Sequence, residues 1–152
     1  NGIGMTGADG IAMTGADEPT TRGDFPGGFP GDKRNAFSRE GRSREEQDLF
    51  AYIRKLTHLR SELPPLKRGA LTNLFVSEQQ YAYARTLAGA TVVVVINNDK
   101  KPAEIEFDIA TDVLANGTML ADLLGVAKEV QVRAGKLKVN LPERSASIFV
   151  RR

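Results

Sequence analysis

Residues 103–109 read Ala-Glu-Ile-Glu-Phe-Asp-Ile, so apolar and acidic side chains alternate along the stretch. Residues 136–141, Lys-Leu-Lys-Val-Asn-Leu, alternate in the same way with basic and amide side chains. A period of two places every apolar side chain on one face of a β-strand, which predicts strands with one buried and one wet face. Strands of this kind are typical of antiparallel sheets.

The run from Thr91 to Ile96 is apolar and β-branched, apart from the hydroxyl of Thr91, which predicts a central strand covered on both faces. Short turn sequences such as Ala88-Gly89 and Ala134-Gly135 separate the runs. The pattern predicts strands over residues 70–76, 80–87, 91–97, 103–109, 117–123, 127–133, 136–141 and 145–151. Eight short strands at this spacing indicate a mainly β fold, an eight-stranded antiparallel β-sandwich. Ser145 and Ser147 are expected at wet positions of the last strand.

One amphipathic α-helix is expected before the strands. Ser43 and Glu46 have the spacing of a capping box, in which each side chain accepts a hydrogen bond from an otherwise unpaired backbone amide at the start of the helix. Apolar residues then recur at spacings of three and four: Phe50, Ile53, Leu56, Leu59 and Leu63. Pro64 and Pro65 end the helix, which we place at residues 44–62. His58, the only histidine, lies off this stripe and is expected to be solvated.

The first 31 residues hold nine of the 15 glycines, together with Pro19, Pro26 and Pro30. Such a composition has many backbone states to lose on folding and few apolar side chains to bury, so we expect a loop. We interpret Asn1 as an internal position of a longer protein, because no initiator Met and no signal-peptide pattern precede this loop.

The overall composition excludes several classes of function. There are 21 Lys and Arg residues against 19 Asp and Glu, a net charge of +2 that is too small to recruit nucleic acid by itself. Cysteine is absent, which excludes zinc–thiolate sites and a cysteine nucleophile. No apolar run approaches the roughly 20 residues of a membrane span. We therefore expect no nucleic-acid or membrane partner, no metal and no cofactor.

Four stretches carry a family resemblance: residues 22–32 (Arg-Gly-Asp-Phe-Pro-Gly-Gly-Phe-Pro-Gly-Asp), 35–37 (Asn-Ala-Phe), 56–60 (Leu-Thr-His-Leu-Arg) and 66–69. Together they resemble the C-terminal end of an α-amylase family glycoside hydrolase of the cyclomaltodextrinase and neopullulanase type. The resemblance implies that residues 1–62 are the last loop (1–42) and last helix (44–62) of a (β/α)8 barrel. Residues 63–152 would then be the β-sandwich called domain C.

This resemblance also implies an activity, the retaining hydrolysis of α-glucosidic bonds in maltodextrins, cyclodextrins or pullulan, with domain C as a structural cap. The catalytic carboxylates of the family lie on barrel strands upstream of Asn1, so no catalytic residue is expected here and the chain alone should be inactive. The implied partners are an α-glucan oligosaccharide and the N-terminal barrel, with a homodimer left open. The implied compartment is open too, with the periplasm or the exterior favoured over the cytoplasm.

The resemblance further implies substrate contacts in the glycine-rich loop. Related enzymes carry an Asp-Pro-x-x-Arg pattern whose acid and Arg reach hydroxyls of a glucose unit. The match here is Glu18-Pro19-Thr20-Thr21-Arg22, with Asp17 one position earlier, so Asp17 or Glu18 would accept from the sugar and Arg22 would donate to it. Phe29 could form a wall of the sugar cleft. A salt bridge for Arg22 and burial against the barrel for Phe29 are the structural alternatives.

Two further features have plain and functional interpretations. Tyr81 and Tyr83 share one strand face, as a sugar-stacking platform would require, but the chain has no Trp, the usual stacking residue, which favours core or interface packing. A basic cluster precedes the helix and is interleaved with acids, which favours an ordinary charged loop: Lys33, Arg34, Arg39, Arg42 and Arg44. The alternative to a hydrolase fragment is a non-catalytic β-sandwich that binds carbohydrate or another partner.

Overall fold

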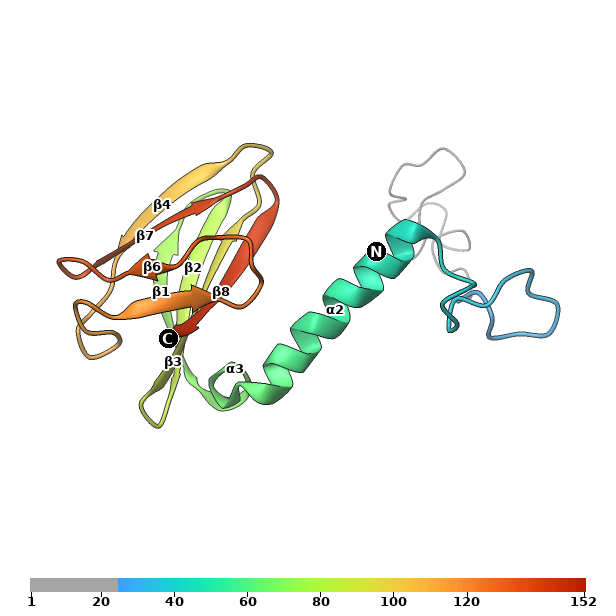
Figure 1. The fold of residues 1–152 in the computed structure, drawn as a ribbon, viewed down its shortest axis with the longest axis horizontal. Coiled ribbons are helices and arrows are strands. Elements are labelled where there is room, and N and C mark those ends of the chain that lie inside the picture. The colour runs from blue at the N-terminus through green and yellow to red at the C-terminus, as the bar shows by residue number, and fades with distance from the viewer. Residues whose placement is uncertain (1–24) are drawn as a thin grey trace. The chain divides into compact units, whose positions relative to one another are not determined.

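The computed structural model describes residues 25–152 (Figure 1). The chain divides into two compact units, one ending at Leu59 and the other covering Arg60–Arg152. We call residues 25–59 the N-terminal unit and Arg60–Arg152 the β domain. Within the described part of the chain, no helix is both long and apolar enough to span a bilayer.

Two helices of the described residues lie before the first strand. Helix α2 spans Arg44–Glu62, the interval predicted from the sequence, and α3 spans Pro64–Arg68. Pro64 and Pro65 follow the end of α2, as predicted. Pro64 also begins α3, because proline at the first helical position has no N–H to leave unpaired and its φ is already helical. Arg60 Nη1 joins the two helices by donating to the Leu66 carbonyl oxygen at 2.7 Å.

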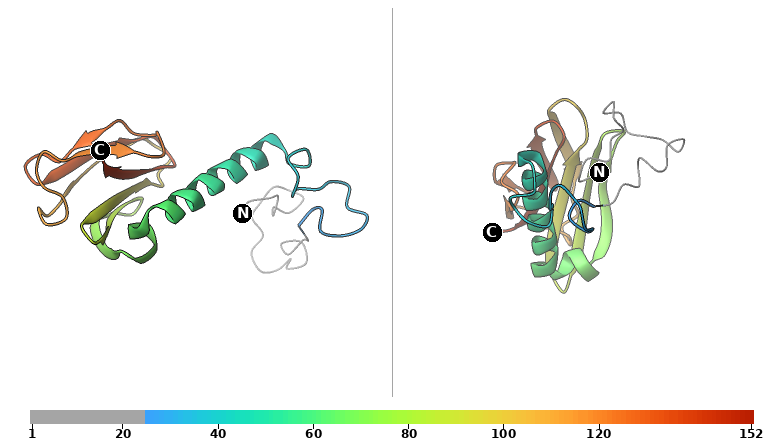
Figure 2. Two further views of the ribbon diagram at one scale, coloured as in Figure 1. Left: turned by 60° about the horizontal axis from the view of Figure 1, so that its bottom comes forward. Right: turned by 90° about the vertical axis from the view of Figure 1, so that its right-hand side faces the viewer.

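The eight predicted strands are all present. They are β1 Ala70–Val76, β2 Gln80–Leu87, β3 Ala90–Asn97, β4 Ala103–Asp108, β5 Met119–Asp122, β6 Val130–Gln131, β7 Lys136–Leu141 and β8 Ser145–Arg151. Six of them form a sheet in the order β1-β2-β3-β8-β5-β6, and β4 pairs with β7 in a second sheet. Every pairing is antiparallel. Figure 2 shows the β domain from two further sides.

The core lies between the two sheets. It is formed by one face of the six-stranded sheet and the apolar face of the β4–β7 pair, whose members include Val93, Val95, Phe149, Ile105, Phe107, Leu137 and Val139. Strand β3 lies between β2 and β8, and its residues Val92–Val95 are all buried, as the β-branched run predicts. The other face of β4–β7 carries acids opposite bases: Lys138 is 2.7 Å from Glu104, and Lys136 is 3.6 Å from Glu106.

Strands β5 and β6 are shorter than predicted because one carboxylate draws the intervening backbone away from the ladder. Asp122 Oδ1 accepts from the Leu124 amide at 2.9 Å, and Asp122 Oδ2 accepts from the Val126 and Ala127 amides at 2.7 and 2.9 Å. These three amides therefore point to the end of β5 rather than to a neighbouring strand.

Ser147 corrects one expectation. It was assigned to a wet position, but it is 0% exposed and its hydroxyl donates to Asp122 Oδ2 at 3.0 Å. Its register partner is Val95, so the alternation of β8 places it on the core side. A buried hydroxyl needs a hydrogen-bond partner, and Asp122 supplies it from another strand. Ser145 is half-buried and donates to the Pro142 carbonyl oxygen at 2.8 Å.

The hairpin turns have the backbone that their sequences predict. Ala88 and Gly89 have φ of 49° and 82°, and Ala134 and Gly135 have φ of 49° and 73°. Two consecutive positive φ values define the type I′ turn, whose twist matches that of the flanking strands. These turns fix the registers of β2 with β3 and of the segment before β7.

Candidate functional site

The loop of the N-terminal unit is closed around the carboxylate of Asp32. Its Oδ2 accepts hydrogen bonds from the Gly27 amide at 2.6 Å and the Phe29 amide at 3.1 Å. These donors, with Phe29 the stronger, lower the pKa of Asp32. Gly27 has φ of 102°, and a Cβ there would collide with Asn35. The Ala36 amide donates to the Pro26 carbonyl oxygen at 2.9 Å, which joins the two ends of the loop between them.

Phe29 is the one predicted substrate-contacting residue that lies in the described part of the chain. Its side chain is 59% exposed. Phe25 and Phe37 of the same loop are also exposed, and their rings contact each other with centroids 4.8 Å apart. Asp17, Glu18 and Arg22 lie outside the described residues. The predicted substrate contacts therefore stay predictions.

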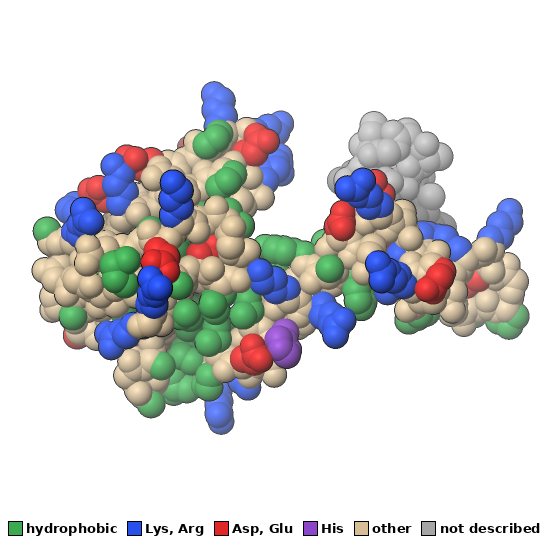
Figure 3. Space-filling view, in the orientation of Figure 1, with side chains coloured by type: hydrophobic (Ala, Val, Ile, Leu, Met, Phe, Trp, Pro, Cys, Tyr) green, Lys and Arg blue, Asp and Glu red, His purple; other side chains and the backbone are tan. Residues whose placement is uncertain are grey.

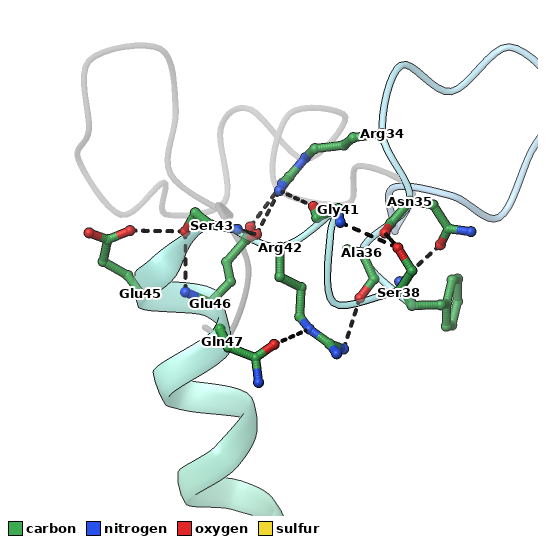
Figure 4. A network of polar contacts seen from close by, with 11 residues as sticks. Arg34, Asn35, Ala36, Ser38, Gly41, Arg42, Ser43, Glu45, Glu46 and Gln47 are labelled. Carbon is green, nitrogen blue, oxygen red and sulfur yellow. Dashed lines mark hydrogen bonds and ion pairs between the residues drawn. The ribbon is translucent and has the colours of Figure 1, made fainter.

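Arg34 joins this loop to the first turn of α2 (Figure 4). Its Nη1 donates to Glu46 Oε2 at 2.6 Å and its Nη2 donates to Glu46 Oε1 at 2.8 Å, a bidentate pair. Glu46 is also a member of the predicted capping box, because its Oε2 accepts from the Ser43 amide at 2.9 Å and its own amide donates to Ser43 Oγ at 3.2 Å. One carboxylate thus caps the helix and holds an arginine of the loop.

Arg42 makes a second connection (Figure 4). Its Nε donates to Gln47 Oε1 at 2.9 Å and its Nη1 donates to the Ala36 carbonyl oxygen at 3.1 Å. Its guanidinium carbon lies 4.0 Å from the centre of the Phe50 ring, a cation–π contact. Gly41 is required beside it, since a Cβ there would overlap the Asn35 backbone.

The carboxyl group of Glu46 is expected to titrate far below the usual range. The Arg34 hydrogen bonds and then the Ser43 amide lower its pKa from 4.5 to about 2. Because the folded-state pKa is depressed, the stabilisation is fully present above the ordinary value and is lost as the pH falls through about 2. Carbon-13 NMR of the Glu46 carboxyl should give a midpoint near this value, and Arg34→Gln should raise it. A wild-type midpoint near 4.5 contradicts the pairing.

Tyr81 and Tyr83 share one face of β2, as predicted, with ring centroids 5.2 Å apart and planes tilted by 32°. Tyr81 Oη donates to Asn73 Oδ1 at 2.6 Å. Burial raises the pKa of Tyr83, which is half-buried. Because the rings pack on one another, part of the aromatic surface that a sugar would need is already covered.

The β domain also has a groove of about 930 Å³ between the β4–β7 pair and the β5–β6 segment. Its lining includes Met119, Val130, Gln131 and Asn140, and no serine, histidine or cysteine. It therefore offers no serine, cysteine or histidine nucleophile. Among residues 25–152, no three His, Asp or Glu side chains are placed to hold a metal ion.

Residues 69–149, more than half of the chain, match the family model described as the α-amylase C-terminal domain. The chain belongs to the α-amylase C-terminal domain family. The predicted resemblance and the predicted β-sandwich are thereby confirmed. The matched residues all lie in the β domain.

Curated relatives of this α-amylase C-terminal domain are much longer proteins. The β/α-amylase of Paenibacillus polymyxa is 30% identical over 104 residues, which cover 68% of the chain and 8% of the relative. The cyclomaltodextrinase of Geobacillus thermopakistaniensis is 29% identical over 101 residues, which cover 65% of the chain and 16% of the relative. The chain thus spans less than a fifth of the length of either protein.

Solved structures agree with the family. An Anoxybacillus α-amylase superposes with a TM-score of 0.63 at 31% identity, over 72% of this chain and 24% of that one. Two further enzymes of the same fold, each 24% identical to this chain, were solved in complex with maltotriose and with acarbose.

Two side-chain pairs, one in the N-terminal unit and one in the β domain, were not predicted from the sequence. The pairing of Arg34 with Glu46 joins residues 12 apart, and Ser147 with Asp122 joins residues 25 apart. The capping-box spacing marked Glu46, but nothing in the sequence marked Arg34 or Arg42, which were interpreted as parts of an ordinary charged loop.

Proposed function

We propose that this chain is the C-terminal part of a retaining α-glucan hydrolase that acts on maltodextrins, cyclodextrins or pullulan, with residues 63–152 as a structural cap. One feature of the β domain carries the proposal. The six-stranded sheet is apolar in its middle strands on both faces. The β4–β7 pair covers one face, and α3 packs against β2 and β3 on part of the other.

The second face is traced by the strand registers. Val94 of β3 lies opposite Tyr83 of β2 on one side and Ile148 of β8 on the other, and all three point away from the core residues Val93 and Phe149. A sheet with a solvated second face would carry polar side chains there. The hydrophobic side chains that gather in one area of the β domain in Figure 3 contrast with the mixed charges around them. Val94 and Ile148 are only 6% and 7% exposed, but Leu71 of β1, which lies opposite Arg85 on the same face, is 54% exposed. We propose that a catalytic barrel packs on this exposed apolar margin of the face.

The ionisable groups of the described residues support a catalytic centre elsewhere. Retaining hydrolysis needs a carboxylic acid whose pKa is raised so that it can protonate the leaving group, about 5 Å from a carboxylate nucleophile. Wherever a carboxyl pKa departs from its ordinary value in residues 25–152, it is lowered: Asp32, Glu45, Glu46 and Asp122. These groups are held as hydrogen-bond acceptors and are unsuited to donate a proton.

The proposal is tested by comparing this chain with the longer protein encoded around it. We expect the coding sequence before Asn1 to specify a barrel, and the longer protein to release reducing oligosaccharides from maltodextrin, cyclodextrin or pullulan with α-configured first products in proton NMR. The 152-residue chain should release no sugar under the same conditions. Hydrolysis by this chain alone, or a longer protein inert on all three glucans, refutes it.

The binding-module alternative is separated by affinity electrophoresis of the 152-residue chain in gels that contain amylopectin. A structural cap should migrate as it does without the polysaccharide. Retardation that Tyr81→Ala abolishes would favour the alternative, with Tyr52→Ala, on α2, as the matched control.

A further inference from the structure

Two arginines of the loop bind two adjacent acceptors on the first turn of α2. Arg34 binds the Glu46 carboxylate and Arg42 binds the Gln47 amide oxygen. We call these four residues the arginine clamp. Residues 34 and 42 border a segment of the loop, so the clamp fixes both ends of that segment to one helical turn. Because the guanidinium group is planar and presents several donors in fixed directions, each contact sets an orientation as well as a distance.

The clamp is connected to Phe29 by a continuous series of hydrogen bonds. Arg42 Nη1 binds the carbonyl oxygen of Ala36, and the amide of Ala36 binds the carbonyl oxygen of Pro26. Asp32, two residues before Arg34, accepts from the amides of Gly27 and Phe29. The backbone that carries the exposed Phe29 ring is thus held from both directions, although the ring itself contacts neither arginine in this series.

We propose that Arg34 and Arg42 are positioning residues of a glucan-binding loop, which hold residues 25–33 in one arrangement on α2 so that Phe29 meets the sugar without prior ordering of the loop. This inference rests on the proposed function for the sugar, and on the contacts above for the clamp. A preordered loop binds more tightly because less conformational entropy is lost on binding.

Glu46→Gln separates the clamp from the helix cap. Glutamine also serves at this position of a capping box, so the hydrogen bond from the Ser43 amide is retained. The charge that binds Arg34 is lost. Glu45→Gln is the matched control, because Glu45 lies one residue earlier and accepts from the Ser43 hydroxyl at 2.9 Å, whereas Arg34 binds Glu46. Arg39→Gln, at an exposed loop position, is the control for Arg34→Gln.

The first measurement concerns the clamp alone and uses the 152-residue chain. Amide exchange of Ala36 should become about five- to tenfold faster in Glu46→Gln and Arg34→Gln, whereas the β3 amides keep their rates. Arg34→Lys should restore part of the protection. Equal rates in wild type and both variants overturn the clamp, whatever the enzyme does.

The second measurement concerns the sugar and uses the longer protein with maltotriose. Loss of a uniform binding contribution raises KM and leaves kcat unchanged. We expect a KM about five- to tenfold higher in both clamp variants, kcat within twofold, and wild-type values in Glu45→Gln and Arg39→Gln. If the clamp residues served only to stabilise the fold, loss of folded enzyme would lower kcat and leave KM unchanged. That result would overturn the positioning role. If the wild-type protein hydrolyses no glucan, the proposed function fails while the exchange result still decides the clamp.

Discussion

Replacing Asn97 with aspartate is expected to lower the unfolding free energy of the β domain by about 3 kcal/mol. Asn97 is 1% exposed, and its amide nitrogen donates to the carbonyl oxygens of Lys101 at 2.9 Å and Pro142 at 2.8 Å. Its amide oxygen accepts from Gln80 Nε2 and from the Asp99 amide. Aspartate has the same shape but would turn a charged oxygen toward two carbonyl oxygens without any donor.

Urea unfolding at pH 7, followed by circular dichroism, measures this difference. Asn98→Asp is the control, because Asn98 is exposed and its amide donates to Gln79 Oε1, so a change within about 0.5 kcal/mol is expected. The Asn97→Asp penalty should shrink as the pH approaches 4, since a protonated carboxyl can donate one hydrogen bond. A penalty below 1 kcal/mol at pH 7 contradicts the four contacts.

Asp122→Asn should also cost about 3 kcal/mol. Asp122 Oδ1 accepts from the Leu124 and Ile148 amides, and Oδ2 accepts from the Val126 and Ala127 amides and from the buried hydroxyl of Ser147. An amide nitrogen in place of Oδ2 would face three donors. Burial raises the pKa of Asp122, but the four backbone amides together outweigh it, so the pKa is lowered.

The pH dependence gives this second prediction its sharpest check. Because the folded-state pKa of Asp122 is depressed, its contribution is present above the unfolded-state value and is lost as the pH falls through the folded value. The gap between wild type and Asp122→Asn should therefore be constant from pH 5 to 8 and narrow below about 4. Asp112→Asn, at an exposed turn position, should show no such gap. A gap that widens in acid would rule out the proposed contacts.

The sequence predicts this fold well where the signals are local. The alternation of residues 103–109 and 136–141 is the pattern of β4 and β7, and the Ser43–Glu46 box defines the start of α2. Ser147 was placed wrongly because a polar side chain at a core position is explained only by Asp122, which lies on another strand. The end of β5 and the start of β6 were placed wrongly because Asp122 binds the backbone amides between them.

The candidate site was less predictable. Phe29 was predicted as a substrate contact through the family resemblance, and its side chain is exposed. The loop that carries it is held by hydrogen bonds of Arg34 and Arg42, which were not predicted. Four basic residues of similar appearance precede the helix and a fifth begins it, and spacing alone does not tell which of them find acceptors on α2. Contacts between a loop and a helix depend on the tertiary path of the chain. Hydrophobic periodicity and secondary-structure propensity do not predict this path.

The acids of β4 set limits on how molecules of this kind meet. Among the described strands, β4 is hydrogen-bonded only to β7, so its other edge is unpaired. Glu104, Glu106 and Asp108 of β4 lie on the face away from the core. If β4 of a second molecule paired with this edge, its carboxylates would lie next to those of the first molecule. Their repulsion would oppose the formation of backbone hydrogen bonds between the two strands. The negative charge therefore disfavours self-association through the unpaired edge of β4 at neutral pH. Strong acid would neutralise the carboxylates and remove this repulsion.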